Sequence, residues 1–531
     1  MKVTVAIPVY NAERHLNVTL DSLVNQTMDP NDFEVICVND KSNDNSVEVI
    51  KSYMKNYSNI KLINRDTNAG GPMIPRNDAI EAARGEYILF LDNDDFLGEE
   101  TLERFFTAAS THKSDVIYGK YIGVNGRVVP QSMFKFGNLP NADIIEHNLV
   151  FSLAPHKMFR LSLIREHQIR FHPEAVIGED QLFVMDCYVR AKVITVLADY
   201  NYYYVVKRGE ENLSVKYFPA KNFYYSFTNI MKNIEESNLH PLYKKQLKAA
   251  FLNRFFQASR LRGYILTRLP SISQKEEWLN ETKKFIDEYI DDELLYMLPS
   301  KYHYFILAAR DNDLQKLLLL HKQMESVNAN DVTRVEDGWI YAKFRLLQKQ
   351  QAYEEEHTVN HLNDSDIFVD EILITDKQCQ IRGQFYQSLL INMDVKNELV
   401  LVHRNSGLEK RIKENRADKT GEFNFSIDFR EFVLNEKLVG PWDVFIEGTI
   451  NGYKKRRRLG QARNGNLLQT KPTAEKKTIL NILDRRTEPK VQTASKKEIT
   501  VKVTSFGKKY KVKVYFTQNF DNLSFDVKLN N

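Results

Sequence analysis

Three aspartates crowd into the segment YILFLDNDDF at residues 87–96, where an apolar run ends in Asp92, Asn93, Asp94 and Asp95. Carboxylates this close repel one another, so a chain selected only for stability would rarely place them together. A D-x-D spacing at a strand end can hold a divalent cation, because Mg²⁺ and Mn²⁺ prefer one or two carboxylates with phosphate oxygens and water. An acidic loop at a helix N-terminus is the structural alternative for this segment taken alone.

Two chemistries use an acidic site of this kind. A phosphatase of the haloacid-dehalogenase type needs the first aspartate as nucleophile and a threonine or valine two residues after the second, where this chain has Phe96. The other chemistry uses the metal to neutralise the diphosphate of a nucleotide sugar while the sugar leaves it. The sequence favours the second, since the motif also follows the fourth predicted strand and not the first.

The elements that must position these carboxylates alternate along the first 95 residues. The apolar patterns predict strands at 3–8, 33–38, 60–63 and 86–91, and helices at 13–26, 46–57 and 75–83, the first of them capped by Asn11. This βαβ order predicts a parallel sheet covered by helices on both faces. Ligands of such sheets bind at the carboxyl ends of the strands, so Asn39 and Asp40 should share one crevice with Asp92.

Other residues near the same predicted crevice suit a nucleotide. The ring of Tyr10 could stack on a base, and the carboxylate of Asp40 could accept a base N–H. In NAGGPMIPRN, the glycines permit close backbone approach next to Asn68, and the Arg76 guanidinium suits a diphosphate. Each residue alone is more often structural, but together they describe a nucleotide pocket.

The order of the motifs carries a family resemblance. PVYN, NDKSND, NAGGPMIPRN and DNDD follow one another, and in this order residues 1–216 resemble a family 2 glycosyltransferase of the GT-A fold. The segments GGPMIPRN, GVNGRVVPQSMF and GEDQLF are similar, more narrowly, to poly(ribitol-phosphate) N-acetylglucosaminyltransferases, which decorate wall teichoic acid in Gram-positive bacteria. The resemblance implies an inverting transfer of N-acetylglucosamine from UDP-N-acetylglucosamine to ribitol phosphate, with a β linkage and Mn²⁺ or Mg²⁺ as cofactor.

The same resemblance assigns roles to single residues. Asp180 in GEDQLF is the expected catalytic base, with Glu179 as its neighbour, although a buried helix-capping pair is the structural alternative. Asp94 is expected to ligate the metal directly, and Asp92 to contact the ribose or the water shell of the metal. The expected donor contacts are Pro8, Tyr10, Asp40, Asn68, Arg76, Asp92, Asn93, Arg127, Lys207, Arg208 and Ser214.

Lys207, Arg208 and Ser214 lie in VVKRGEENLSV, which resembles a loop that closes over the donor in the family. Positive charge there would stabilise the departing diphosphate. The chain departs from the family pattern at Asn39, where relatives often have aspartate, and at Asn212, where they have histidine. Asparagine is a neutral and weaker ligand, so metal affinity, donor affinity or loop closure is expected to differ.

The length, net charge and cysteine spacing of the chain limit its expected location and partners. The chain has 531 residues, a net charge of +4 and no apolar run near the roughly 20 residues of a membrane span. Its first residues form a predicted strand and lack signal-peptide features, so we expect a cytoplasmic enzyme with peripheral contact at the inner membrane face as an option. The spacing of Cys37, Cys187 and Cys379 argues against disulfides and zinc. The charge is too small to imply nucleic acid, but lysines and arginines at 454–458 and 496–513 suit either an anionic partner or a solvated face.

The patterns predict three parts and an α/β fold class. Residues 1–216 form the catalytic domain, 217–352 an all-α linker domain, and 353–531 one or two small immunoglobulin-like β-sandwich modules. The last part is expected to form a homotrimer or to bind polymer. Two other functions stay open at this point: an inactive polymer-binding or scaffold protein of the transferase fold, and a transferase for another UDP-sugar or another anionic cell-surface glycopolymer.

Overall fold

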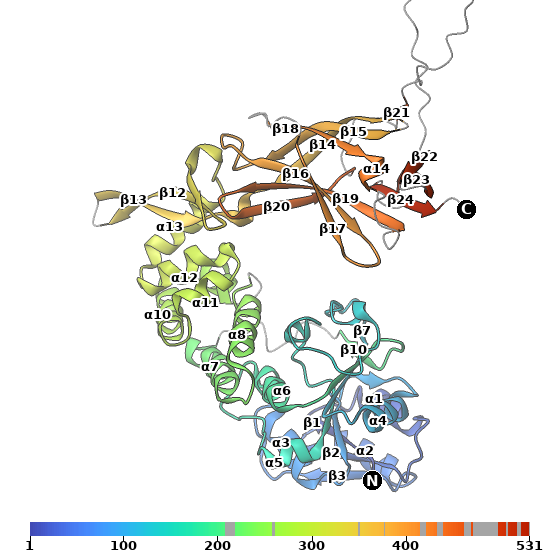
Figure 1. Ribbon diagram of the computed structural model, residues 1–531. Coiled ribbons are helices and arrows are strands. Elements are labelled where there is room, and N and C mark those ends of the chain that lie inside the picture. The colour runs from blue at the N-terminus through green and yellow to red at the C-terminus, as the bar shows by residue number, and fades with distance from the viewer. Residues whose placement is uncertain are drawn as a thin grey trace, which may run out of the picture. The chain divides into compact units, whose positions relative to one another are not determined.

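The computed structural model divides the chain into two compact units (Figure 1). One contains residues 1–298 and 306–314, and the other contains 299–305 and 315–531. The structure describes residues 1–207, 218–257, 261–348, 351–375, 377–414, 421–432, 439–460, 469–470, 498–505, 508–517 and 522–529. Within these described parts, no helix is both long enough and apolar enough to cross a membrane.

The core of the first unit is a seven-stranded sheet in the order β3-β2-β1-β4-β8-β6-β9. Its strands are β1 (Val3–Val9), β2 (Phe33–Asn39), β3 (Ile60–Asn64), β4 (Tyr87–Phe90), β6 (Val116–Gly119), β8 (Met158–Arg160) and β9 (Ile194–Leu197). Neighbouring strands are parallel except at β8, which runs antiparallel to β4 and β6. Every residue of β1, β2 and β4 is buried, which explains their near-continuous apolar sequences. The predicted parallel sheet is confirmed, with one antiparallel strand added.

Helices cover both faces of this sheet, with α3 on one side and α1 and α4 on the other (Figure 1). They are α1 (Leu16–Val24), α2 (Ser46–Met54), α3 (Met73–Ala82), α4 (Thr101–His112), α5 (Leu161–Glu166) and α6 (Glu179–Arg190). The first helix begins later than predicted, because Asn11 is not its cap. Asn11 has a left-handed backbone (φ 48°), and its side-chain oxygen accepts a 3.0 Å hydrogen bond from the Asn43 N–H beyond β2.

A second, three-stranded sheet in the order β5-β10-β7 lies beside the acidic segment. It consists of β5 (Phe96–Leu97), β7 (Tyr121–Val124) and β10 (Tyr203–Val206). Because β5 directly follows Asp95 and pairs with β10, the residues of β10 are brought to the acidic cluster.

The remaining helices are α7 (Ala220–Glu236), α8 (Pro241–Phe255), α9 (Leu261–Gly263), α10 (Ile272–Tyr289), α11 (Asp292–Met297), α12 (His303–Arg310) and α13 (Leu314–Met324). Buried rings of Phe223, Phe255 and Trp278 hold α7, α8 and α10 together. The helical stretch is shorter than the predicted 217–352, since β11 (Val332–Glu336) and β12 (Trp339–Gln348) lie within it. These two segments are rich in β-branched and aromatic residues, which favour strands.

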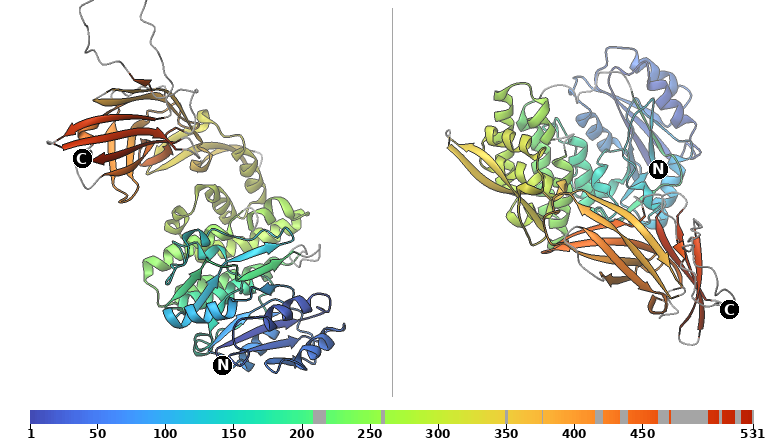
Figure 2. Two further views of the ribbon diagram at one scale, coloured as in Figure 1. Left: turned by 90° about the vertical axis from the view of Figure 1, so that its right-hand side faces the viewer. Right: turned by 90° about the horizontal axis from the view of Figure 1, so that it is seen from above.

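The second unit contains a β-sandwich with one hydrophobic core shared by two sheets. Two further views show its strands (Figure 2). One sheet has the order β18-β15-β14-β21 and the other β17-β16-β19-β24-β23-β22, with β20 also paired to β19. The strands of these two sheets are β14 (Ser365–Ile374), β15 (Gln378–Gln387), β16 (Lys396–His403), β17 (Glu409–Lys413), β18 (Glu422–Asp428), β19 (Gly440–Ile450), β20 (Tyr453–Arg458), β21 (Gln469–Thr470), β22 (Glu498–Ser505), β23 (Lys508–Phe516) and β24 (Leu523–Leu529), with the short helix α14 (Phe429–Phe432). A separate three-stranded sheet has the order β11-β12-β13 and includes β13 (Gln351–Thr358).

Candidate active site

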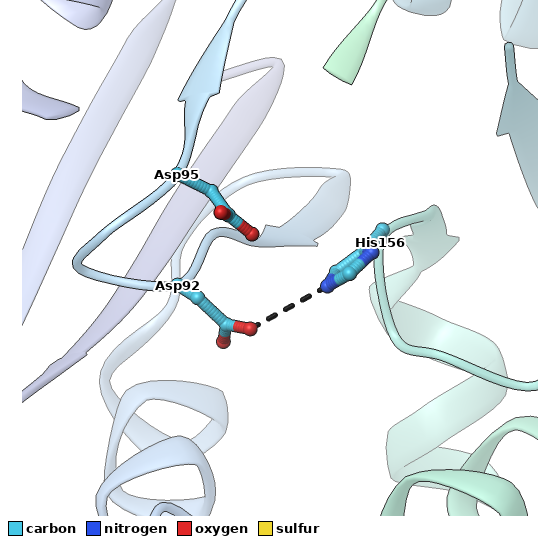
Figure 3. Close-up of side chains that lie close together, drawn as sticks. All are labelled: Asp92, Asp95 and His156. Carbon is cyan, nitrogen blue, oxygen red and sulfur yellow. Dashed lines mark hydrogen bonds and ion pairs between the residues drawn. The ribbon is translucent and has the colours of Figure 1, made fainter. Parts of the chain in front are cut away.

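Asp92, Asp95 and His156 form an acidic cluster whose closest side-chain ligand atoms all lie within 4.8 Å of one another (Figure 3). The two aspartates follow β4, and His156 precedes β8, the antiparallel neighbour of β4. His156 Nε2 lies 3.4 Å from Asp92 Oδ2, and its ring stacks on Tyr203 with a 4.3 Å centroid separation. Tyr203 in turn donates its hydroxyl to Asp95 Oδ2 at 3.0 Å, so β10 holds both the histidine and the second carboxylate.

The two carboxylates of this cluster have opposite electrostatic surroundings. Burial raises the pKa of Asp95 to about 7, and the nearby Asp92 carboxylate adds to the effect. Burial also acts on Asp92, but the Arg76 guanidinium and His156 outweigh it and hold its pKa well below the usual range. Asp92 therefore stays ionised at neutral pH, whereas Asp95 titrates there.

The donor atoms of the cluster suit a divalent cation. Two carboxylates match Mg²⁺ or Mn²⁺, and the imidazole favours Mn²⁺ of the two. His156 Nδ1 is buried and has no hydrogen-bond partner among the described residues, so the ring is not fixed by an acceptor on that side. The structure thus groups Asp95 and His156 with Asp92. The half-buried Asp94 is not a member of this group, and its role as the direct ligand stays a prediction.

Arg76 joins this cluster to the expected catalytic base. It lies in the first turns of α3, and its Nη2 donates to Asp92 Oδ1 at 2.8 Å while its Nη1 donates to Asp180 Oδ1 at 2.7 Å. The side chain is only 3% exposed and lies over the ring of Phe171, 5.0 Å from the centroid. The structure therefore places Arg76 between the two carboxylates, and its contact with a diphosphate stays a prediction.

Glu179 and Asp180 occupy the first turn of α6, after Gly178. Gly178 has φ +78°, a backbone conformation that L side chains rarely adopt. The preceding carbonyl, that of Ile177, accepts a 2.5 Å hydrogen bond from Ser226 Oγ on α7, so a helix outside the catalytic sheet supports this turn.

Burial raises the pKa of both acidic residues in this turn. For Asp180 the opposing cause is Arg76, whose positive charge favours the ionised carboxylate. For Glu179, burial and the neighbouring Asp180 carboxylate raise the pKa to about 7. A carboxylate with a raised pKa is a stronger proton acceptor, as a general base requires.

The predicted nucleotide-binding residues gather at the paired ends of β1 and β2. Pro8 is buried within β1, Tyr10 is half exposed just beyond it, and the Asp40 N–H donates to the Val9 carbonyl at 2.8 Å. Asn68 Nδ2 donates to the Asp40 carbonyl at 2.8 Å. The prediction that these segments share one crevice is therefore supported by direct contacts between them.

The Asp40 carboxylate already has partners inside the protein. It accepts 2.9 Å hydrogen bonds from the Ala69 N–H, and Arg65 Nε lies 3.0 Å from its Oδ1. A carboxylate can accept about four hydrogen bonds, so these contacts leave acceptor capacity for a base N–H. The role of Asp40 in base binding stays a prediction.

Arg127 and Lys207 come together at the ends of two paired strands. Val124 of β7 is in register with Val206 of β10, and both cationic side chains lie just beyond these ends and are exposed.

The Asn93 carbonyl is fixed by a 3.0 Å hydrogen bond from Thr19 Oγ1. Arg208, Asn212 and Ser214 lie outside the described residues.

The sequence reasoning missed His156, Lys157 and Tyr203. Lys157 is fully buried, with its Nζ 2.5 Å from the Ala154 carbonyl and 4.2 Å from the centroid of the Tyr118 ring, and burial lowers its pKa to about 7. The only local signal was the polar pair HK inside the apolar segment LAPHKMF. Neither this pair nor the tyrosine is near the aspartates in sequence, and their contacts arise from the strand order.

Three parts of the chain match known protein families. Residues 4–167 match the family described as Glycosyl transferase family 2, residues 220–321 the Glycosyl transferase TarS linker domain, and residues 358–527 the TarS beta-glycosyltransferase C-terminal domain 1. A poly(ribitol-phosphate) beta-glucosyltransferase of Bacillus spizizenii is 37% identical, over 99% of this chain and 78% of the relative. The chain belongs to the poly(ribitol-phosphate) glycosyltransferases.

Other members of the poly(ribitol-phosphate) glycosyltransferases are similar as well. The poly(ribitol-phosphate) beta-N-acetylglucosaminyltransferase TarS of Staphylococcus aureus is 30% identical over 87% of this chain and 79% of its own. The crystal structure of S. aureus TarS has a TM-score of 0.63 at 26% identity, covering 100% of this chain and 86% of that chain. The crystal structure of S. aureus TarS 1–349 in complex with UDP-GlcNAc has a TM-score of 0.61 at 33% identity, covering 67% and 99%. The predicted family and fold class are confirmed.

Proposed function

We propose that this glycosyltransferase moves a sugar from a UDP-sugar to ribitol-phosphate units of wall teichoic acid, with inversion at the anomeric carbon. The observation that carries the proposal is the pairing of one buried arginine, Arg76, with both Asp180 and Asp92. This pairing holds an acceptor-side base next to the acidic cluster on the donor side. A direct displacement at the anomeric carbon needs a base and a site that stabilises the leaving anion close to each other, and here a single guanidinium contacts both.

Asp180 acts as the general base in this reaction. An acceptor hydroxyl attacks the anomeric carbon from the face opposite the nucleotide, its proton passes to an Asp180 oxygen, and the bond from that carbon to the diphosphate oxygen breaks. No covalent intermediate forms. Arg76 keeps Asp180 ionised until it accepts the proton, and it holds the carboxylate in place.

The residues on the donor side bind the leaving nucleotide. Asp92, Asp95 and His156 would hold Mn²⁺ or Mg²⁺, which supplies positive charge against the diphosphate when bound. Arg127 and Lys207 add exposed positive charge at the end of the β7–β10 pair. Asp94 remains a candidate for direct metal contact from the family resemblance.

Two sugars are supported by different observations. The family resemblance and the named activity of S. aureus TarS support N-acetylglucosamine. The B. spizizenii relative, which matches nearly the whole chain, is named a beta-glucosyltransferase and supports glucose. Comparison of kcat/KM for the two UDP-sugars decides between them, because the enzyme discriminates through its stabilisation of the transition state.

We also propose a cytoplasmic enzyme that meets its polymer at the inner membrane face, and a homotrimer formed through residues 353–531. The similarity of residues 358–527 to the TarS C-terminal domain supports a shared role for this part. A trimer would raise avidity along a repeating polymer. Light scattering of the full chain at micromolar concentration tests the trimer, and a monomeric mass would refute it.

The decisive experiment measures UDP release from each UDP-sugar with Mn²⁺ or Mg²⁺, with and without unglycosylated poly(ribitol phosphate). Wild type should require both polymer and metal, and Asp180→Asn should lose about 10²- to 10⁴-fold in kcat, since it keeps the shape of the side chain but not the base. Donor binding by the variant should persist. Polymer-dependent release by Asp180→Asn at the wild-type rate would refute the assigned base, and no release by wild type with any UDP-sugar would favour a polymer-binding protein without activity.

A further inference from the structure

Five lysines project from one outward face of the β-sandwich, formed by β22, β23 and β24. The inner face of these strands carries core residues such as Val501, Val512 and Val527, so the alternate residues point outward. The outward lysines are Lys502, Lys509, Lys511, Lys513 and Lys528. We call this set the lysine face.

The register of the strands brings like charges directly opposite each other. Lys502 of β22 pairs in register with Lys511 of β23, and Lys511 pairs with Lys528 of β24. Three lysines thus lie in one row across three strands, spanning roughly 10 Å at the usual strand spacing. Like charges at directly opposite positions destabilise a sheet. A row of this kind is expected where an anion binds across the strands.

Carboxylates neutralise only part of the lysine face. Lys513 Nζ lies 2.6 Å from Glu498, and Lys528 Nζ lies 3.3 Å from Asp526. Among the residues that the structure describes, Lys502, Lys509 and Lys511 have no ion-pair partner, and all three are exposed. Three positive charges on this face are therefore uncompensated.

The basic run KKRRR of β20, in the same sheet, behaves differently. Arg456 Nε donates to Glu447 at 2.7 Å, Arg458 Nη2 donates to Asp443, and Lys455 Nζ donates to the Asn363 carbonyl at 2.7 Å. Three of its five cations are thus used inside the protein, which leaves only Lys454 and Arg457 fully exposed. Two exposed cations thus remain on β20, against three on the lysine face that have no ion-pair partner among the described residues, although KKRRR is the denser basic run in the sequence.

Protection of a sheet edge does not account for the row. Lysines on an edge strand prevent pairing with another chain, and β22 is an edge strand among the described residues. That role explains Lys502, but β23 and β24 are paired on both sides and do not need it.

From these observations we infer that the lysine face is a second binding site for the acceptor polymer, which it holds by the phosphodiesters of its backbone. A single extended polyanion fits a row three strands wide. A membrane surface would call for several apolar or aromatic side chains beside the cations. The outward neighbours in register with Lys509 and Lys513 are instead Thr504, Thr500 and Asp526, and Tyr515, which is half-buried beside Lys513, is the one aromatic residue among the described outward residues of these strands. The identity of the polymer rests on the proposed function, whereas binding of a polyphosphodiester does not.

The test measures binding of fluorescein-labelled, unglycosylated poly(ribitol phosphate) to the full chain by anisotropy at 50 and 200 mM NaCl. The variant carries Lys502→Gln, Lys509→Gln and Lys511→Gln. The control variant carries Lys377→Gln, Lys396→Gln and Lys413→Gln, three exposed lysines of the same sandwich outside the lysine face, with the same change in net charge.

We expect the lysine-face variant to bind the polymer about tenfold more weakly at 50 mM NaCl, and to lose part of the salt dependence, because fewer counterions are released on binding. The control should change by less than about twofold. Equal weakening of polymer binding in both variants would show that the effect depends only on net charge and would overturn the site. Wild-type binding by the lysine-face variant would also overturn it.

Two further measurements separate this inference from the proposed function and from a membrane role. The lysine-face variant should release UDP at the wild-type rate with a dimer of ribitol phosphate, because the dimer lacks the run of phosphodiesters that the row of lysines would hold. Polymer binding without any sugar transfer by wild type would refute the proposed function and leave the site standing. Binding of phosphatidylglycerol vesicles that depends on the three lysines, with unchanged polymer binding, would assign the face to the membrane and overturn the inference.

Discussion

Replacement of Arg76 by methionine should move the acidic limb of the pH profile of kcat/KM to higher pH. The guanidinium donates to Asp180 and Asp92 at 2.7 and 2.8 Å, so the charge centres lie about 4 Å apart, where a pair near a protein surface interacts by about 4 kcal/mol. The Asp180 side chain is 31% exposed and the Asp92 side chain is 33% exposed, so water screens about half of this interaction energy. The remaining ~2 kcal/mol favours the ionised form of Asp180, so its loss in the variant raises the pKa of Asp180 further.

The assay is polymer-dependent UDP release measured from pH 5 to 9, with thermal unfolding recorded at each pH. Arg104→Met is a matched control, because Arg104 also pairs with two carboxylates, those of Glu100 and Asp199, and lies over a ring, that of Tyr200. Its side chain is 39% exposed and lies outside the site. An acidic limb that stays in place in Arg76→Met would refute the role of Arg76 in holding Asp180 ionised, even if the rate fell at every pH.

Four other substitutions test separate parts of the site. The folded-state pKa of Glu179, about 7, lies above the value of about 4.3 in unfolded chains. Its contribution to stability is therefore present below pH 4 and is lost as the pH rises through 7. Glu179→Gln should unfold at a higher temperature than wild type at pH 8.5, and at nearly the same temperature as wild type at pH 4. His156→Ala should weaken Mn²⁺ binding to the full chain about tenfold, measured by calorimetry, because it removes a candidate ligand. The same measurement on Asp94→Asn tests the predicted direct ligand. Unchanged Mn²⁺ affinity in either variant would remove that residue from the site. Gly123→Ala would place a Cβ 1.7 Å from the Arg127 carbonyl oxygen and must displace that turn. If Arg127 contacts the donor, KM for the donor should rise about tenfold. An unchanged KM in a folded variant would exclude the contact between Arg127 and the donor.

Local patterns were enough to predict the elements that carry the site. The strands β1, β2 and β4 are buried along their whole length, so their apolar runs stand out, and the polar residues after them mark the ends. Parallel strands bring such ends together, which is why Asp40 and Asn68 could be placed in one crevice from sequence. The family motifs supplied the base, Asp180, which no periodicity identifies.

The contacts that the sequence did not predict are all non-local. His156 reaches Asp92 because β8 runs antiparallel between β4 and β6, an insertion that no local pattern encodes. The position of Arg76 depends on Phe171, which is 95 residues away and covers the guanidinium. In the second unit, the charge on β20 looked available, but the acidic partners of Arg456 and Arg458 lie on β19 and become visible only through the register of the two strands.

The hydrogen bond from Ser226 to the Ile177 carbonyl has a consequence for the order in which the enzyme matures during synthesis. These residues are 49 positions apart, so the turn that presents Asp180 leaves the ribosome well before the helix that supports it. A nascent chain that has completed the catalytic sheet still lacks this support. We therefore expect the enzyme to become competent only after α7 has been made and has docked, and we expect a fragment that ends at residue 216 to keep the donor-side residues of the sheet with an unsupported base.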